Sequence, residues 1–503
     1  MKKQKFKLLS SSKNIVVSFT MFVLFLPLSF GQQYAFDALK YSFPYQIGTA
    51  RYAGMGGALG ALGTDISCLN NNPAGLGMIR NTEFSVTPGL FFNFTEADYE
   101  GTKYTEDKFV FNFGNIGAVY AMRFNKDKST GMQFLNFGLC YQRTNNFNNN
   151  VFFNGIDSTF SIAQSFTDAA QGFTPNVLTA DFEKLALNTL LIDTMWNNTT
   201  YENLGMMNNQ SKGFSRQNLN AGSTGDILLS GAINYGNKLF VGTSFGISIL
   251  NYYRENNYSE SDVNNLSARF QSLNFKEVIS VTGTGVNVKV GVVYKPLDWF
   301  RVGFAFHTPT WYDITEESYA ELSTNLNIGN FNSRSTNQRF DYNLITPWRL
   351  QGSLGFFAFK RLAIGVEYEF ADYTNINLRP SSNVFLAENN YIDTVFSSSH
   401  IIRLGAEFKL DPFKLRAGYN FQSDPFKKTA LLTNALHNVS LGAGFKMVIG
   451  RNKKRDRYLV FDLTYLLTLT SGQITANNYA AIPQYAQLKT GMHNIIGTVG
   501  FQF

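Results

Sequence analysis

The stretch Leu239-Phe-Val-Gly-Thr-Ser-Phe-Gly-Ile-Ser-Ile249 changes chemical character at almost every residue. Large apolar side chains hold most odd positions, while glycine and serine hold most even ones. Because successive side chains of an extended strand point to opposite faces, this alternation predicts a strand with one apolar face and one small, polar face. The pattern returns near 286–294, 300–306, 362–370 and 459–467, so the chain is predicted to be all-β.

Fourteen strands are predicted from this period of two. Their ranges are 82–97, 107–124, 131–148, 226–236, 238–256, 277–295, 299–312, 339–358, 361–377, 396–410, 413–423, 434–449, 456–472 and 488–503. The even number and the alternation of short turns with long loops are typical of single-chain bacterial barrels. The longest join, about 149–225, is predicted to hold helices at 167–172 and 182–196. Three roles remain open for it: a lid over a ligand, packing on the barrel rim, or contact with a partner protein.

The alternation alone does not say whether the apolar faces point inward, as in a soluble sandwich, or outward to lipid. The two ends of the chain favour lipid. Residues 1–31 combine lysines, an apolar run from Ile15 to Phe30 and small residues before Gln32, which predicts a cleaved secretory signal peptide. The last strand alternates up to the aromatic Phe503, which resembles the end that the assembly machinery of outer-membrane barrels recognises. Aromatic residues, 15% of the chain, suit a lipid-facing wall and its interfaces.

Charge and cysteine content exclude some classes of protein. Loss of residues 1–31 would remove five lysines and no acids, lowering the formal net charge from +7 to about +2. The basic balance therefore gives no support for nucleic-acid binding. Cys68 and Cys140 are too few for a disulfide framework. Either two free buried thiols or one bridge between plug and wall is compatible with the sequence.

The segment ahead of the strands is rich in glycine and poor in large side chains, so it should form neither a good helix nor a good strand. It predicts irregular backbone packed inside the barrel: a hatch over 32–81, followed by the barrel over 82–503. Gly54, Gly56 and Gly57 would allow close backbone approach. In Asn72-Pro73-Ala74, proline fixes φ and asparagine caps backbone groups. This motif either holds the hatch movably against the wall or is a plain structural turn.

Five segments resemble the FadL/TodX family of outer-membrane transporters for long-chain fatty acids and aromatic hydrocarbons. They are Gly48-Thr-Ala-Arg51, Gly54-Met-Gly-Gly-Ala58, Asn72-Pro-Ala-Gly-Leu76, Trp348-Arg-Leu-Gln-Gly-Ser-Leu-Gly355 and Leu362-Ala-Ile-Gly-Val-Glu-Tyr-Glu-Phe-Ala-Asp-Tyr373. The resemblance implies a 14-stranded antiparallel transmembrane β-barrel with an N-terminal hatch in the lumen. It also implies capture of a lipophile at the extracellular mouth, a shift of the hatch, and lateral release into the bilayer.

The abundance of Asn and Phe, with a signal segment ending Phe30-Gly31 before two glutamines, resembles outer-membrane proteins of Bacteroidota. Family members there are often labelled haemin receptors or serve secretion machines. The alternative function is therefore a non-transporting barrel subunit of an envelope or secretion complex. A transporter should show an apolar pocket between mouth and hatch and a break in wall hydrogen bonding. A docking subunit should lack the break and present an apolar patch on its loops.

Charged residues predicted to face the lumen lie on late strands and carry both signs, which favours salt bridges with one another or with the hatch. They are Arg301, Glu367, Glu369, Arg403, Glu407, Lys409, Lys414 and Arg416. A second role, contact with a ligand carboxylate, is kept for Arg403 and Arg416. The four histidines, His307, His400, His437 and His493, lack the spacing of metal ligands.

We expect no enzyme, cofactor or metal, because the sequence has no Gly-x-Ser-x-Gly elbow and no clustered Ser, His and Asp. The expected partners are outer-membrane lipid, a hydrophobic small-molecule ligand and the barrel-assembly machinery. An envelope protein partner belongs to the alternative function.

Overall fold

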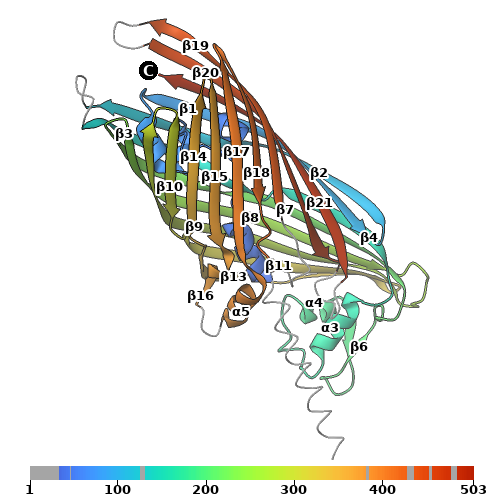
Figure 1. Ribbon diagram of the computed structural model, residues 1–503. Helices are drawn as coiled ribbons and strands as arrows, with labels where there is room; N and C mark the ends of the chain where they lie inside the picture. Colours follow the sequence, from blue (N-terminus) through green and yellow to red (C-terminus); the bar gives the residue numbers. More distant parts are fainter. Residues whose placement is uncertain are drawn as a thin grey trace, which may run out of the picture.

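The computed structural model describes residues 33–45, 47–124, 131–380, 384–427, 435–451, 456–476 and 484–503. The predicted signal peptide lies outside these ranges. Within them, fourteen strands follow one another around a closed antiparallel barrel (Figure 1). In order around the wall they are β1 (Glu83–Tyr99), β2 (Thr102–Arg123), β3 (Met132–Asn146), β7 (Lys212–Tyr235), β8 (Leu239–Ser261), β9 (Phe270–Leu297), β10 (Phe300–His307), β14 (Arg349–Ala358), β15 (Leu362–Asp372), β17 (Ser398–Leu410), β18 (Phe413–Gln422), β19 (Leu436–Arg451), β20 (Asp456–Thr475) and β21 (Tyr485–Gln502). Pairing of β1 with β21 closes the ring.

The predicted fold class is confirmed, and each predicted strand has its counterpart in the wall. Two predicted strands are interrupted, however. The strand predicted at 299–312 is β10 followed by β11 (Trp311–Leu326), and that at 339–358 is β13 (Gln338–Ile345) followed by β14. The register places Pro309 opposite Pro347. Neither proline has an N–H to give to the ladder, so both strands break at the same height.

The predicted 149–225 loop is wrong at both ends. β4 (Asn149–Asp157) pairs with the first half of β7, and the join between them holds α3 (Ile162–Ala170) and α4 (Glu183–Asn188). The second helix stops early because Leu190 takes a positive φ of 55° and the chain turns into the hairpin of β5 (Ile192–Thr194) and β6 (Tyr201–Asn203). The strand extensions were missed because they alternate between polar residues such as Asn, Gln and Ser, which gives no hydrophobic period.

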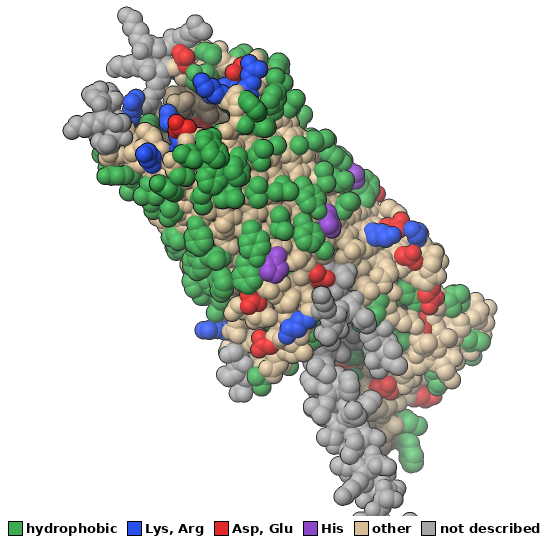
Figure 2. Space-filling view, viewed as in Figure 1, with side chains coloured by type: hydrophobic (Ala, Val, Ile, Leu, Met, Phe, Trp, Pro, Cys, Tyr) green, Lys and Arg blue, Asp and Glu red, His purple; other side chains and the backbone are tan. Residues whose placement is uncertain are grey.

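Apolar side chains of the wall point outward. On β8, Val241, Phe245 and Ile247 are exposed, whereas Ser244 and Ser248 between them are buried in the lumen. Figure 2 shows the result as a broad apolar belt across the face in view, with charged side chains gathered toward the two ends of the barrel. This arrangement is the inverse of a soluble β-sandwich and suits a lipid-facing wall. No helix among the described residues is both long and apolar enough to cross a membrane.

The N-terminal segment fills the lumen (Figure 1). A helix over 33–42 is followed by α2 (Ala50–Gly54) and by two short 3-10 helices, η1 (Ile66–Leu69) and η2 (Pro73–Met78). The prediction of irregular backbone thus missed several helical turns. Shorter connections at the barrel end near Gly236-Asn237 define the short-turn end, and α3 and α4 lie at the opposite, long-loop end.

Wall glycines explain how this segment fits. Gly355, Gly365, Gly405 and Gly418 stand side by side on β14, β15, β17 and β18. A Cβ on any of the last three would collide with the backbone of residues 55–58. Their absent side chains let the backbone of the lumen segment lie directly on the wall.

Candidate functional site

The Asn72-Pro73-Ala74 motif begins η2 and sits in a shallow seat in the wall. Asn72 Oδ1 accepts the Ala74 N–H over 3.2 Å, and Asn72 Nδ2 donates to the Gly60 carbonyl over 3.0 Å. A Cβ at Gly242 would collide with the Pro73 carbonyl, and one at Gly291 with Asn72 Oδ1. The motif is therefore a helix cap locked into a seat made by two wall glycines. Its role in gating stays a prediction.

The predicted hatch glycines also lie against the wall. Gly56 and Gly57 have positive φ values of 60° and 81°, and a Cβ at Gly56 would approach the Leu404 carbonyl to 2.7 Å. Gly54 faces the Thr464 hydroxyl, where a Cβ would lie at 2.8 Å. Only glycine meets both demands, on φ and on space, at Gly56 and Gly57.

Arg403 links the wall to the hatch through Glu367. Its guanidinium bridges Glu367 and Glu369, the latter at 2.8 Å. Glu367 Oε2 also accepts the Gly60 N–H over 2.9 Å and Asn71 Nδ2 over 3.2 Å, which ties two hatch segments to one wall carboxylate. A ligand carboxylate at Arg403 would have to compete with two buried glutamates.

Arg416 makes a second such link nearer the short-turn end. It contacts Glu407 at 2.7 Å and Asp462 at 2.6 Å, and the hatch residue Arg51 shares Glu407 at 3.0 Å. Lys409 departs from the predicted lumen set, because it is exposed at the turn beside Asp411. These salt bridges are the arrangement expected for lumen charges, and ligand contact by Arg403 or Arg416 stays a prediction.

The helix over 33–42 occupies an apolar chamber nearer the long-loop end. The chamber is lined by buried aromatic side chains from the wall and its loops, here called the aromatic chamber: Phe147, Tyr252, Tyr312, Tyr342, Tyr373, Phe385 and Phe396. Asp37 anchors the helix, with Arg254 at 3.2 Å and Lys40 at 2.9 Å. Although burial acts to raise the pKa of Asp37, these two cations hold it below its usual range.

The wall ladder is broken between β2 and β3. Pairing covers only Asn115–Arg123 of β2, so within the described chain Thr102–Gly114 has a ladder partner on its β1 side alone. The break begins at a bulge, where the β1–β2 register shifts between Thr87 and Pro88. Part of the free edge lies within the apolar belt, because its outward side chains Phe109, Phe111 and Phe113 are exposed and apolar. We call this interruption of the backbone ladder, between Phe109–Gly114 and Asn145–Asn150, the side gap; side chains of β1 contact its inner border through the bond from Thr95 to Asn149.

The side gap and the lumen helix touch each other through asparagine. Asn145 Nδ2 donates to the carbonyls of Lys40 and Phe43, over 3.0 and 2.8 Å. Next to it, Gln142 Nε2 donates to the Ile47 carbonyl over 3.0 Å. Both amide atoms of the buried Asn112, on the opposite edge, lack a hydrogen-bond partner in the described structure. The bent strand therefore holds the end of the lumen helix beside a gap that is polar on its inner side.

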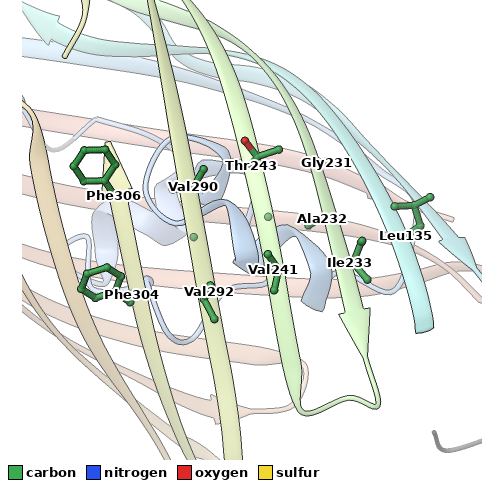
Figure 3. A pocket seen from close by; sticks show the side chains of 12 residues that line it. Leu135, Gly231, Ala232, Ile233, Val241, Thr243, Val290, Val292, Phe304 and Phe306 are labelled. Carbon is green, nitrogen blue, oxygen red and sulfur yellow. The ribbon is translucent and has the colours of Figure 1, made fainter. Parts of the chain in front are cut away.

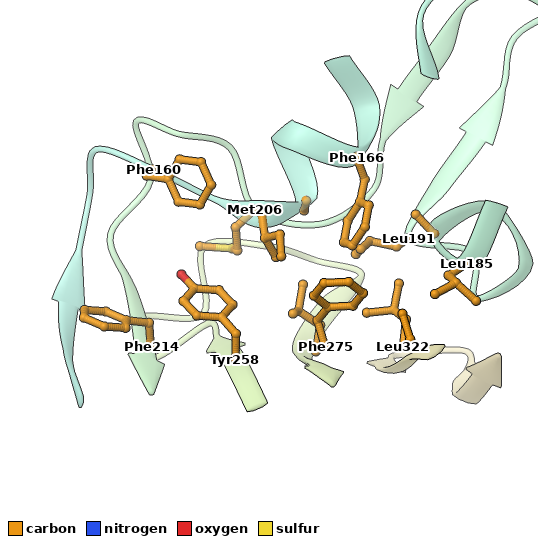
Figure 4. Close-up of a cluster of buried hydrophobic side chains, with 14 of the residues drawn as sticks. Phe160, Phe166, Leu185, Leu191, Met206, Phe214, Tyr258, Phe275 and Leu322 are labelled. Atoms are coloured by element: carbon orange, nitrogen blue, oxygen red, sulfur yellow. The ribbon is translucent and has the colours of Figure 1, made fainter. Parts of the chain in front are cut away.

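The 158–211 join packs on the rim at the long-loop end. Figure 4 shows apolar side chains of α3 and α4 meeting those of the wall extensions, with Phe166 and Phe275 in edge-to-face contact at 5.3 Å. Glu260 fixes the start of α3 by accepting the Ile162 N–H and the Ser161 hydroxyl, each over 2.7 Å. Of the three roles left open for this join, rim packing is the one that the contacts display.

Two hollows flank the hatch. An apolar one of about 420 Å³ opens on the outer face, directly behind the seat of Asn72-Pro73-Ala74, between the strands that carry Ile233, Val241 and Val292 (Figure 3). A charged one of about 380 Å³ lies at the short-turn end and is bordered by Arg51 and Arg301. Neither hollow is the apolar pocket expected between mouth and hatch; the lumen helix packs in the aromatic chamber there.

Sequence reasoning found the hatch motif and the lumen ion pairs but missed the lumen helix, Asn145 and the side gap. A signal for the gap was present, since Pro88 and Gly114 interrupt otherwise regular strands. Cys68 and Cys140 are both free and buried. Among the described residues, no group of three or more His, Cys, Asp or Glu is placed to hold a metal ion.

No protein-family model and no curated protein matches the chain. Solved structures do. A FadL homologue of Pseudomonas aeruginosa superposes with a TM-score of 0.56 at 12% identity, over 92% of this chain and all of that one. A deltaS2 mutant of TodX, described as a monoaromatic hydrocarbon channel, gives 0.51 at 13% identity over 92% of this chain and 100% of its own. The toluene transporter TbuX of Ralstonia pickettii gives 0.49 at 14% identity, over 91% and 99%. At these identities the first two likenesses show that the barrel fold is shared.

Proposed function

We propose that the chain is an outer-membrane channel for hydrophobic small molecules, such as long-chain fatty acids or aromatic hydrocarbons. The ligand is captured at the long-loop end, which faces outside. It displaces the lumen helix from the aromatic chamber, and the hatch shifts. The ligand then leaves through the side gap into the outer leaflet of the membrane.

The broken ladder between β2 and β3 carries this proposal. Unpaired N–H and C=O groups are costly in lipid, so an open strand edge at membrane depth persists only where it borders protein or a water-filled path. The free edge of β2 is such an edge, and its inner border holds buried amide groups without a partner. A lipophile that slides past it gains about 0.8 kcal/mol for each methylene it buries in lipid.

The aromatic chamber supports the capture step. Its seven aromatic side chains surround a helix that contributes both small and aromatic apolar side chains, among them Ala38, Leu39 and Tyr41. A hydrocarbon could replace the apolar contacts of the helix. Displacement of the helix would also break its ion pair with Arg254 and its two bonds from Asn145, so these polar groups would have to be solvated or find new partners. Because Asn145 lies beside the side gap and bonds the Phe43 carbonyl, movement of the helix would pull on the strand at the side gap.

Mass spectrometry of the detergent-extracted protein tests the proposal. We expect copurified fatty acid or another lipophile in sub-stoichiometric to stoichiometric amount. The chain should also speed fatty-acid entry into liposomes. Stable protein partners with no bound lipophile, and no effect on entry, would overturn it.

A docking subunit is the second candidate, and one feature favours it. The β5–β6 hairpin presents Trp196 with 96% of its surface exposed, next to the exposed Met195. Fully exposed tryptophan is uncommon on a protein surface that has no partner. Pull-down with the wild-type chain and with Trp196→Ser separates the two functions, because a channel would retain ligand entry in that variant.

A further inference from the structure

Three exposed histidine–tyrosine pairs recur on the outer wall. Tyr368 on β15 bonds His400 on β17 over 2.7 Å, with the tyrosine hydroxyl at His Nδ1. The same contact joins Tyr419 to His437 over 2.9 Å and Tyr465 to His493 over 2.6 Å. Each histidine also packs against a phenylalanine, with ring centroids 5.0–5.7 Å apart, namely Phe370, Phe421 and Phe94.

The three histidines lie at one height on the barrel. The His400 carbonyl accepts the N–H of Ser423, which follows β18, while His437 pairs with Phe421, two residues nearer the short-turn end. His437 in turn pairs with Leu469 of β20, while His493 pairs with Leu467, again two residues nearer that end. The register therefore shifts by one residue for each strand passed. One residue rises about 3.3 Å along a strand and neighbouring strands lie about 4.8 Å apart, so this shift keeps the height above the membrane constant when the strands tilt by about 35°.

This height is the long-loop border of the apolar belt. In Figure 2 the histidine side chains in view form a line across the barrel, with the apolar belt on one side and charged and polar side chains on the other. Trp348, directly before β14, lies at the same height two strands before His400. Its ring centroid is 5.7 Å from that of Phe370. Tryptophan is typical of the level where lipid head groups begin.

We propose that these histidines form a girdle that binds the phosphate groups of outer-leaflet lipids. This rests on the outer-membrane location proposed above. When the tyrosine hydroxyl is the donor to Nδ1, Nε2 carries the ring proton and presents an N–H donor at head-group level. A phosphate oxygen of a lipid is the acceptor available there, and its acyl chains lie on the outward apolar side chains below.

Native mass spectrometry with two added lipids of equal acyl chains tests the girdle: dioleoyl phosphatidic acid and dioleoylglycerol, which lacks the phosphate. The wild-type barrel should retain phosphatidic acid in preference. The variant His400→Phe/His437→Phe/His493→Phe keeps the rings but loses the donors, and should bring the ratio close to one. Each single variant should lower it by about two- to tenfold at its site, the range for one hydrogen bond.

The matched control changes outward residues two positions below each histidine. Ile402→Ala/Val439→Ala/Ile495→Ala should lower retention of both lipids and leave the ratio unchanged. Tyr368→Phe/Tyr419→Phe/Tyr465→Phe should lower the ratio partly, since the tautomer is no longer fixed. Excess inorganic phosphate should not displace the lipid, because the acyl chains contribute to binding; displacement would mean a free-phosphate site and overturn the proposal.

An unchanged ratio in the histidine variants, or no preference in the wild type, would also overturn it. Heat-dependent gel mobility checks that each variant is folded, and the single variants stand in if the triple one fails to assemble. Ligand entry into liposomes should be the same in all of them. An unchanged lipid ratio together with normal ligand entry would overturn the girdle and leave the channel function intact. A changed ratio without ligand entry in the wild type would overturn the channel function and leave the girdle intact.

Discussion

The side-chain amide of Asn145 donates to the Phe43 carbonyl over 2.8 Å, so a wall strand that bends at the side gap holds the end of the lumen helix. The same amide also bonds the Lys40 carbonyl. We predict that movement of the helix and rearrangement of the gap are coupled through these two bonds.

Asn145→Leu should loosen the lumen helix. Two buried carbonyls would lose their donor, at a cost of about 1–3 kcal/mol, so exposure of the helix should rise roughly 5- to 150-fold. Hydrogen exchange of residues 33–42 measures this. Asn136→Leu is the control, because Asn136 bonds the carbonyls of Leu76 and Ile79 farther down the hatch. Unchanged exchange over 33–42 in Asn145→Leu would refute the coupling.

Asp37→Asn should also release the helix, because Arg254 and Lys40 would lose their shared carboxylate. In the wild type the pKa of Asp37 is held below its usual range. A carboxyl with a lowered pKa stabilises the fold above its unfolded pKa, about 3.9, and loses this contribution as pH falls further. Exchange over 33–42, corrected for its intrinsic pH dependence, should stay level from pH 8 to 5 and rise below about pH 4. A rise already between pH 8 and 6 would contradict the anchor.

Gly291→Ala and Gly242→Ala should unseat the Asn72-Pro73-Ala74 motif, since the new Cβ atoms would meet Asn72 and Pro73. Overpacking of this kind costs about 1–3 kcal/mol. Thermal unfolding in detergent should show the loss. Gly352→Ala and Gly497→Ala are matched controls, because neither Cβ would find an atom within 4 Å. Equal unfolding temperatures for both sets would show that the seat is not tight.

Arg403→Gln should destabilise the barrel without changing ligand preference. Removing one partner of a buried ion pair costs about 3–5 kcal/mol, and here Glu367 would lose its cation while Glu369 would keep only Arg349. Binding of a fatty acid and of a neutral hydrocarbon should fall together, if at all. Selective loss of the fatty acid would instead support the ligand-carboxylate role predicted for Arg403.

Strand number and facing follow from sequence because lipid imposes a strict period of two on the wall. The Leu239–Ile249 stretch shows this, and its exposed and buried residues alternate as predicted. The polar strand extensions such as β4 carry no such period, since water on one side and protein on the other tolerate many residues. The sequence therefore predicts a loop where β4 lies.

The site was predictable only where one residue type has one structural use. Gly56 and Pro73 are such residues: Gly56 takes a positive φ, and Pro73 begins the 3-10 helix η2. Asn145 is one of many asparagines in the chain, so its two bonds to the lumen helix were not visible before the strand was placed. Likewise, Pro309 and Pro347 lie 38 positions apart, and only the register reveals that they face each other.

The route of the ligand is the central claim, and photolabelling tests it most directly. A fatty acid carrying a diazirine at its methyl end would be bound to the barrel in liposomes, illuminated and mapped by mass spectrometry. The account predicts labels on both edges of the side gap, at Phe109–Gly114 and Asn145–Asn150, besides the aromatic chamber. Labels in the chamber and in the charged hollow near Arg51 and Arg301, with none at the side gap, would contradict it by showing an axial path.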